Sequence, residues 1–98
     1  MKHLLNNINK VFDHRIRLAI MSALMVNDYM DFKSLKELLG VTDGNLASHI
    51  KALEKEDFIN VDKQFIKKKP NTRYSASKIG KKAFNDHLDA LEKLINRT

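Results

Sequence analysis

The chain has no cysteine, which excludes disulfide bonds and thiolate metal sites. It has no apolar run near the roughly 20 residues that a membrane-spanning helix needs, and no signal-peptide core at its N-terminus. A glycine-rich phosphate loop, a nucleophile elbow and a carboxylate pair set against an apolar pocket are also missing. We therefore expect a cytoplasmic protein that is not an enzyme and needs no cofactor.

What the chain does contain is typical of one small globular domain over residues 1–98. Hydrophobic residues make up 43% of it and charged residues 31%, a balance seen in folded rather than disordered chains. A chain this short buries a smaller share of its surface than a larger domain does. Its size therefore favours a strong partner.

Positive charge is concentrated in the second half of the chain. The net charge is +6, and residues 63–82 hold eight of the 18 Lys and Arg residues and no Asp or Glu. The other ten bases stand against all 12 acids, so the rest of the chain is slightly acidic. Concentrated positive charge attracts phosphate better than the same charge spread evenly, which favours a polyanionic partner.

Four histidines raise the question of a metal site: His3, His14, His49 and His87. No two of them have the close spacing of metal ligands, so we predict no metal. His49 is expected to pack or to contact phosphate. His87 is expected to lie in an interface with a hydrogen-bond partner, with a pH or metal sensor as the alternative role.

Two amphipathic helices are predicted at the start of the chain. Apolar residues recur at helical spacing over residues 4–12, and Asp13 is expected to cap a second helix over residues 14–26. The second helix has apolar stripes on nearly opposite sides, one of Ile16, Ala19, Ile20 and Ala23 and one of Leu18, Met21 and Met25. A helix that is apolar on two sides is covered on both, by the terminal helices or by a second copy of the chain.

A helix-turn-helix motif is predicted next, after a short strand at residues 29–32. Ser34, with Glu37 three residues later, has the pattern of a capping box for a short helix. Gly40 favours the left-handed backbone that ends a helix, and Thr42 is expected to cap the following one. Two helices joined by so short a turn are typical of a helix-turn-helix.

The helix predicted over residues 42–58 has a narrow apolar stripe of Leu46, Ile50 and Leu53. Its opposite face has small residues, hydrogen-bonding side chains and two lysines, but no acid: Gly44, Asn45, Ser48, Lys51, Ala52 and Lys55. Such a face can approach a polyanion without desolvating a carboxylate. We interpret it as a helix that enters a DNA groove, with an ordinary solvated face as the alternative.

A basic β-hairpin is predicted after this helix. Apolar and polar residues alternate from Ile59 to Phe65 and from Thr72 to Ala76. The segment KKKPN lies between them, and Pro70 with the asparagine after it is expected to form the turn. Lysines at a hairpin tip can protect strand edges from pairing, but three in succession exceed that need.

Ser77 is expected to cap a long final helix that ends near Asn96. Phe84, Leu88, Leu91 and Ile95 recur at spacings of four, three and four, as in a coiled-coil seam. This is more apolar surface than so small a domain can cover. We therefore predict a homodimer through residues 1–12 and 77–98. Its expected interface residues are Leu4, Leu5, Ile8, Leu18, Met21, Met25, Phe84, His87, Leu88, Leu91 and Ile95.

The order of these elements, with the segments LLGVTDGNLASHIKALEKEDFI and KKKPNTRYSASKIGKKAF, resembles the small winged-helix DNA-binding domains of the MarR and ArsR transcriptional regulators. The resemblance covers roughly residues 12–94. It rests on Thr42, Asp43, Gly44, Asn45, Leu46 and His49, on Lys67 to Pro70 with Thr72, and on Ser77 with Gly80. Ala76 and Ser77 depart mildly, since the family usually has a larger aliphatic residue and Thr there. The implied fold is mainly α, an α+β winged helix-turn-helix with about five helices and a two- to three-stranded β wing.

By this resemblance, residues 42–57 form the recognition helix and residues 63–73 the wing. The recognition-helix residues implied in DNA binding are Thr42, Asp43, Gly44, Asn45, Ser48, His49, Lys51 and Lys55. The wing residues are Lys63, Lys67, Lys68, Lys69 and Arg73. Asn45, Ser48 and Lys51 could reach base edges in the major groove. The wing tip or Arg73 could enter the minor groove.

The resulting prediction is a homodimeric transcriptional regulator, a repressor in the favoured case, that binds double-stranded DNA at an inverted repeat. The alternative is a winged helix used as a protein-interaction or assembly module, with the basic wing meeting an acidic partner. No separate ligand domain is expected. A small-molecule effector would have to bind at the dimer interface, where Met21 and Met25 could line an adaptable pocket.

Overall fold

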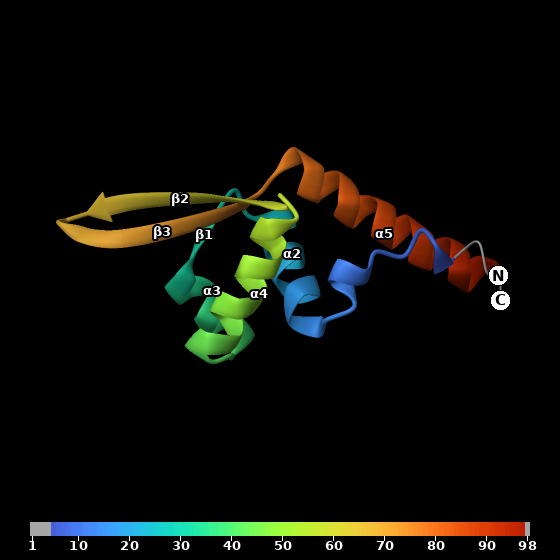
Figure 1. The fold of residues 1–98 in the computed structure, drawn as a ribbon, viewed down its shortest axis with the longest axis horizontal. Helices are drawn as coiled ribbons and strands as arrows, with labels where there is room; N and C mark the ends of the chain where they lie inside the picture. The colour runs from blue at the N-terminus through green and yellow to red at the C-terminus, as the bar shows by residue number, and fades with distance from the viewer. Residues whose placement is uncertain (1–4, 98) are drawn as a thin grey trace.

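The computed structural model describes residues 5–97 of the chain (Figure 1). Within that range it has a 3₁₀ helix, four α-helices and three strands, where about five helices were predicted. In chain order the elements are η1 (Lys10–Phe12), α2 (Arg15–Val26), β1 (Met30–Asp31), α3 (Phe32–Leu39), α4 (Asp43–Lys55), β2 (Ile59–Ile66), β3 (Lys69–Ala76) and α5 (Lys78–Arg97). The order is that of a winged helix-turn-helix, so the predicted fold is confirmed.

The three strands form one antiparallel sheet in the order β1-β3-β2. β2 and β3 are a hairpin paired from Ile59 and Ala76 at its base to Ile66 and Lys69 at its tip. The body of the molecule lies between two projecting elements. Figure 1 shows the hairpin extending past the helices at one end and α5 extending at the other, in a molecule with extents of 54 × 25 × 21 Å.

The core lies where α2, α3 and α4 meet the inner face of the sheet. The largest fully buried side chains are Ile20, Met21, Leu24, Leu35, Leu46 and Leu53. Burial of each such side chain contributes about 1.5 to 3 kcal/mol to folding. The predicted apolar stripe of α4 is therefore the side by which this helix is anchored, and its opposite side faces outward.

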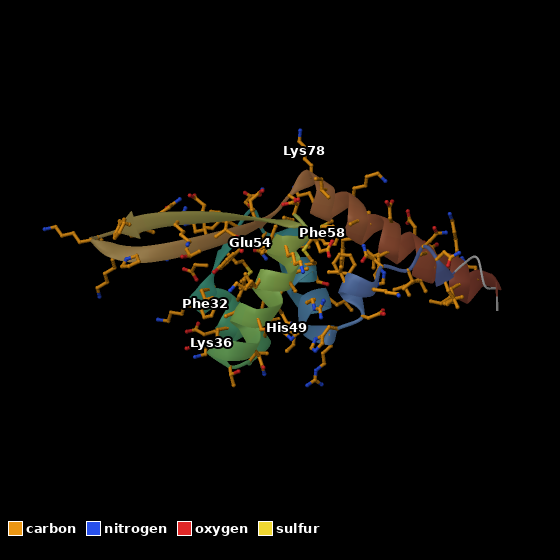
Figure 2. All side chains as sticks on the ribbon, in the orientation of Figure 1. Phe32, Lys36, His49, Glu54, Phe58 and Lys78 are labelled. Carbon is orange, nitrogen blue, oxygen red and sulfur yellow. The ribbon has the colours of Figure 1, made fainter. Side chains whose placement is uncertain are left out.

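The junction between the hairpin and α5 is built on a serine and a glycine. Ser77 Oγ accepts a hydrogen bond from the Gly80 N–H at 2.9 Å and donates one to the Asp57 carbonyl at 2.6 Å, which confirms the predicted cap. A Cβ on Gly80 would overlap the backbone carbonyl of Phe58, a residue labelled in Figure 2. Only glycine lets α5 approach so closely, and this packing sets the angle at which α5 leaves the body.

Two predicted helix caps are wrong. His14, not Asp13, caps α2, since its Nδ1 accepts a hydrogen bond from the Ile16 N–H at 3.3 Å. Asp31, not Ser34, caps α3, since its Oδ1 accepts from the Ser34 N–H at 2.8 Å. The end of β1 places the Asp31 carboxylate just ahead of α3, and a carboxylate there is also favoured by the helix dipole. The αL cap at Gly40, with φ 63°, was predicted correctly.

The helix predicted over residues 4–12 is not continuous in the described part of that range. A turn follows Leu5, whose carbonyl accepts from the Ile8 N–H at 3.2 Å, and η1 begins only at Lys10. Asn9 interrupts the helix, because its side chain accepts a hydrogen bond from the Val11 N–H and so competes with helical pairing. Leu4 lies outside the described residues.

The predicted hairpin turn is also displaced. The turn is Lys67 and Lys68, with φ of 51° and 65°, whereas Pro70 and Asn71 lie within β3. A two-residue turn with positive φ at both positions follows the twist of the strands and allows them to pair over their full length.

No helix within residues 5–97 is long and apolar enough to cross a membrane.

Candidate nucleic-acid interface

The outward side of α4 begins at a capped N-terminus. Thr42 Oγ1 accepts a hydrogen bond from the Asn45 N–H at 3.2 Å, as predicted. All but one of the proposed recognition-helix residues are exposed: Thr42, Asp43, Gly44, Asn45, Ser48, Lys51 and Lys55. The amide, hydroxyl and lysine groups of this side are therefore accessible to a ligand.

Gly44 in the first turn of α4 has no structural explanation within the chain. A Cβ at this position would have no atom within 4 Å. Glycine inside a helix costs about 0.5 to 1 kcal/mol relative to alanine. The missing side chain leaves room for close approach from outside, which fits a helix end that lies against another molecule.

The acid at this end of α4 is paired within the chain. Asp43 forms a salt bridge of 2.8 Å with Lys36 of α3, and the side chains are 72% and 44% exposed. Exposed pairs contribute at most about 1 kcal/mol. The pair nevertheless compensates the negative charge of Asp43 at the exposed end of α4 and connects the two helices of the motif. Figure 2 labels Lys36 on α3.

His49 is half-buried and packs against α2. Its ring lies on that of His14 with a centroid distance of 4.0 Å, and its Nδ1 accepts a hydrogen bond from Arg17 Nε at 3.3 Å. Burial lowers the pKa of His49 below its ordinary value, and the nearby charges of His14 and Arg17 lower it further. These contacts support the packing role that the sequence suggested. Within residues 5–97 no three His, Asp or Glu side chains gather into a cluster that could hold a metal ion.

A groove of about 270 Å³ separates α4 from the hairpin. Lys51 and Glu54 border it from α4, and Lys63 and Thr72 border it from the strands. Burial of the phenol raises the pKa of Tyr74, and the charge of Glu54, labelled in Figure 2, raises it further. The surface around α4 is therefore less free of acid than its predicted face suggested. The acid-free segment is residues 63–82, which begins just after Asp62 of β2.

The register of the hairpin determines what faces α4. Lys63 is paired with Thr72 and Phe65 with Pro70. Since side chains alternate across a strand, all four lie on the same face as buried Ile59 and Tyr74. Phe65 is nevertheless 79% exposed. The alternation that predicted an apolar face is correct, but this end of the face extends past the helices that would cover it.

The proposed wing residues occupy two different environments. Lys63, Lys67, Lys68 and Lys69 are exposed. Arg73 lies nearer the base of the wing, on the opposite face, where its guanidinium stacks on the Tyr29 ring at 4.2 Å. It is paired across the strands with Asp62 and Asp31, and the pKa of Asp31 is lowered chiefly by the Ser34 backbone hydrogen bond, with Arg73 as a smaller cause. Arg73 thus has partners within the chain, and its assignment to DNA stays a prediction.

One basic residue near this surface was missed by the sequence reasoning. Arg15 is exposed at the start of α2 and borders a cavity of about 470 Å³ together with Thr42 and Asn45. A cation in the first turn of a helix is opposed by the helix dipole. That unfavourable placement was the available signal that Arg15 serves a purpose other than helix stability.

The chain is similar to a known protein family over the elements described above. A model of the winged helix DNA-binding domain matches residues 16–95, which include both helices of the motif and the hairpin. The chain belongs to the winged helix DNA-binding domain family. The resemblance drawn from the sequence is confirmed, and DNA is the partner that the family description gives to this winged helix.

Individual relatives agree with this assignment. An uncharacterized protein of Methanocaldococcus jannaschii is 35% identical over 79 residues, which cover 81% of this winged helix and 86% of that protein. A transcriptional regulator homologue from Pyrococcus horikoshii OT3 has a TM-score of 0.87 and 27% identity, covering 98% of this chain and 96% of its own. An ArsR family transcriptional regulator has a TM-score of 0.64 and 18% identity, covering 100% of this chain and 96% of its own. The last likeness bears on the fold alone.

The predicted interface residues of this winged helix fall into three groups. Leu5, Leu88 and Ile95 are exposed by 55%, 44% and 71%. The half-buried group is Ile8, Leu18, Met25 and Leu91. Met21, Phe84 and His87 are buried within their own chain, where Phe84 and His87 contact the Phe12 ring. Only the first two groups have surface to offer a second copy, and Met21 has no surface with which to line an effector pocket.

Proposed function

We propose that this winged helix is a homodimeric transcriptional regulator, most simply a cytoplasmic repressor, that binds double-stranded DNA at an inverted repeat. The observation that carries the proposal is the juxtaposition of two surfaces across one groove. One is the exposed side of α4, and the other is the projecting hairpin, whose residues 63–76 have five basic side chains and no acidic one. No catalytic role is proposed.

The two surfaces have different chemistry and would divide the task. Asn45, Ser48 and Lys51 of α4 are exposed and can hydrogen-bond to base edges in the major groove. The exposed lysines of the wing are point charges suited to phosphates, which supply affinity without regard to sequence. Arg15 lies beside Thr42 and Asn45 and would add a phosphate contact at the other end of α4.

The homodimer is supported by the apolar stripe of α5. One side of α5 is covered within the chain, where Phe84, His87 and Ala90 are 5%, 4% and 4% exposed, but Leu88 beside that face is 44% exposed. Leu5, from the segment next to α5, is also largely exposed. Apolar side chains that their own chain leaves uncovered are suited to a second copy. Two copies would present two α4 helices, about one duplex turn or 34 to 36 Å apart.

Gel-shift titration with random-sequence duplex at several salt concentrations tests DNA binding. If about six phosphates are neutralised, the slope of log affinity against log salt should be near −5. Lys68→Glu should weaken binding to all sequences alike. Lys33→Glu, at an exposed position on α3 that belongs to neither the proposed DNA-binding residues nor the predicted dimer segments, should have a much smaller effect. Asn45→Ala should instead reduce the preference between sequences.

The protein-interaction alternative predicts a different outcome. If the wing meets an acidic protein, duplex DNA at moderate salt will bind more weakly than about millimolar, below even typical non-specific affinities. That result, or equal effects of Lys68→Glu and Lys33→Glu, would favour the alternative.

A further inference from the structure

The tip of the wing combines two features that are unfavourable for an isolated domain. Phe65 is 79% exposed and the adjacent Ile66 is 39% exposed. The two turn residues between the strands, Lys67 and Lys68, both have positive φ, a conformation in which non-glycine residues cost about 1 to 2 kcal/mol each. Asparagine and glycine are the residues that such turns prefer. The tip therefore lacks the residues that would stabilise the hairpin and has an aromatic ring and charges instead.

The charges around the exposed ring indicate the kind of partner. Phe65 and Ile66 precede Lys67, Lys68 and Lys69 directly, and no acidic residue occurs between Lys63 and Lys82. An apolar group surrounded by cations is suited to a ligand with an anionic edge and an apolar interior. Duplex DNA has phosphates at its grooves and stacked bases between them.

Phe65 is placed to reach the DNA minor groove next to the major groove that α4 would occupy. On the protein, Val61 borders the groove between α4 and the hairpin. Phe65 lies four residues further along β2, about 13 Å at the rise of a strand. Centres of neighbouring major and minor grooves are about 17 Å apart, half of a duplex turn. The two-residue turn also keeps the tip narrow, as entry into a minor groove about 6 Å wide requires.

We propose that Phe65 inserts as an apolar wedge into the minor groove, partly unstacks a base step and bends the DNA. Side chains of this kind kink duplexes when they enter the minor groove, and flexible pyrimidine–purine steps are the least costly place to do so. The wedge rests on the proposed DNA-binding function and adds to it a source of sequence preference that involves no base hydrogen bond.

The test measures affinity and bend together. Energy transfer between dyes at the two ends of a duplex of about 30 base pairs, centred on a TA step in an A·T-rich segment, reports the bend. Phe65→Ala should keep the melting temperature and the salt slope of the unchanged protein, lose about tenfold in affinity and lose most of the bend. Phe65→Leu, which keeps an apolar wedge, should recover part of both. Val26→Ala, at a side chain that is 82% exposed on α2, should change neither.

The outcomes distinguish failure of the Phe65 wedge from failure of the proposed DNA-binding function. If Phe65→Ala binds and bends DNA as the unchanged protein does, while Lys68→Glu still weakens binding, the wedge is wrong and DNA binding stands. If Lys68→Glu has no effect on DNA affinity, the proposed function itself fails. Vesicles of phosphatidylserine and phosphatidylcholine provide the last comparison. If Phe65→Ala abolishes binding to them and leaves DNA affinity and bend intact, an anionic membrane replaces DNA as the target of the tip.

Discussion

Gly44 is the residue at which folding and binding make opposite demands. It lies in the exposed first turn of α4, where a Cβ would meet nothing, so the chain itself has no need of glycine there. Gly44→Ala should therefore stabilise the protein by about 0.5 to 1 kcal/mol and weaken DNA binding, because the added methyl group stands between α4 and the duplex. Thermal unfolding and a gel shift on the same samples check both signs. A variant that is more stable and binds as before would remove Gly44 from the interface.

Two buried or half-buried histidines make stability depend on pH. Burial lowers the pKa of both His49 and His87, and the Asp13 carboxylate opposes the shift of His87. Each Nδ1 accepts a hydrogen bond, His49 from Arg17 and His87 from the Asn9 N–H at 3.1 Å, which requires a neutral ring at that nitrogen.

A histidine whose folded-state pKa lies below its unfolded value gives its full stability above the unfolded pKa of about 6.5. That stability is lost as pH falls, because the unfolded chain then binds more protons. The free energy of unfolding should therefore decrease as the pH falls below about 7. Chemical denaturation at a series of pH values checks this, and His49→Asn, which can still accept from Arg17, should reduce the dependence. A flat profile in the unchanged protein would contradict these packing roles.

Among the structural elements, the wing turn resembles Gly44, because its residues are unfavourable for folding and suited to DNA binding. Replacing Lys67 by Asn and Lys68 by Gly supplies the residues that the turn conformation favours. The double variant should stabilise the protein by about 1 to 2 kcal/mol and reduce DNA affinity and the salt slope, since two phosphate contacts are lost. Denaturant unfolding and salt-dependent binding measure the two effects. Lost stability would mean that the lysines serve the fold, and unchanged affinity that they do not touch DNA.

The elements that could be predicted from sequence are those with a strong local signal. The stripe of Leu46, Ile50 and Leu53, the αL residue Gly40 and the alternation along β2 and β3 each specify local structure, and each was read correctly. Caps and turns were less certain, because several residues compete for them. Asp31, not Ser34, caps α3, because β1 ends at Asp31 and α3 begins directly after it.

The exposure of side chains depends on tertiary packing and could not be predicted. The sequence placed Phe65 on an apolar face and Arg73 near the wing tip. Neither the length by which the hairpin passes the helices nor the pairing of β1 with β3 is specified by spacing along the chain. These two features leave Phe65 exposed and place Arg73 on the Tyr29 ring, opposite Asp31 and Asp62 of the neighbouring strands.

For the molecule as a whole, recognition of an inverted repeat requires two chains. Leu88→Asp places a charge on the exposed part of the α5 stripe, and burying that charge against a second copy would be costly. We expect the dimer to dissociate at concentrations at which the unchanged protein is dimeric, with weaker binding to an inverted repeat. Val26→Asp, at an exposed position on α2, is the matched control. Sedimentation equilibrium reads the result, and an unchanged dimer would move the interface away from Leu88.

Selection of bound sequences from a pool of random duplex DNA tests whether the protein reads DNA with a pair of α4 helices. A dimer that reads DNA with two α4 helices should enrich an inverted repeat whose half-sites are centred about 10 base pairs apart, one turn of the duplex. The same selection with Asn45→Ala should enrich a less defined half-site. A single unrepeated site would contradict the two-fold dimer, and a pool that shows no enrichment would contradict sequence reading by α4.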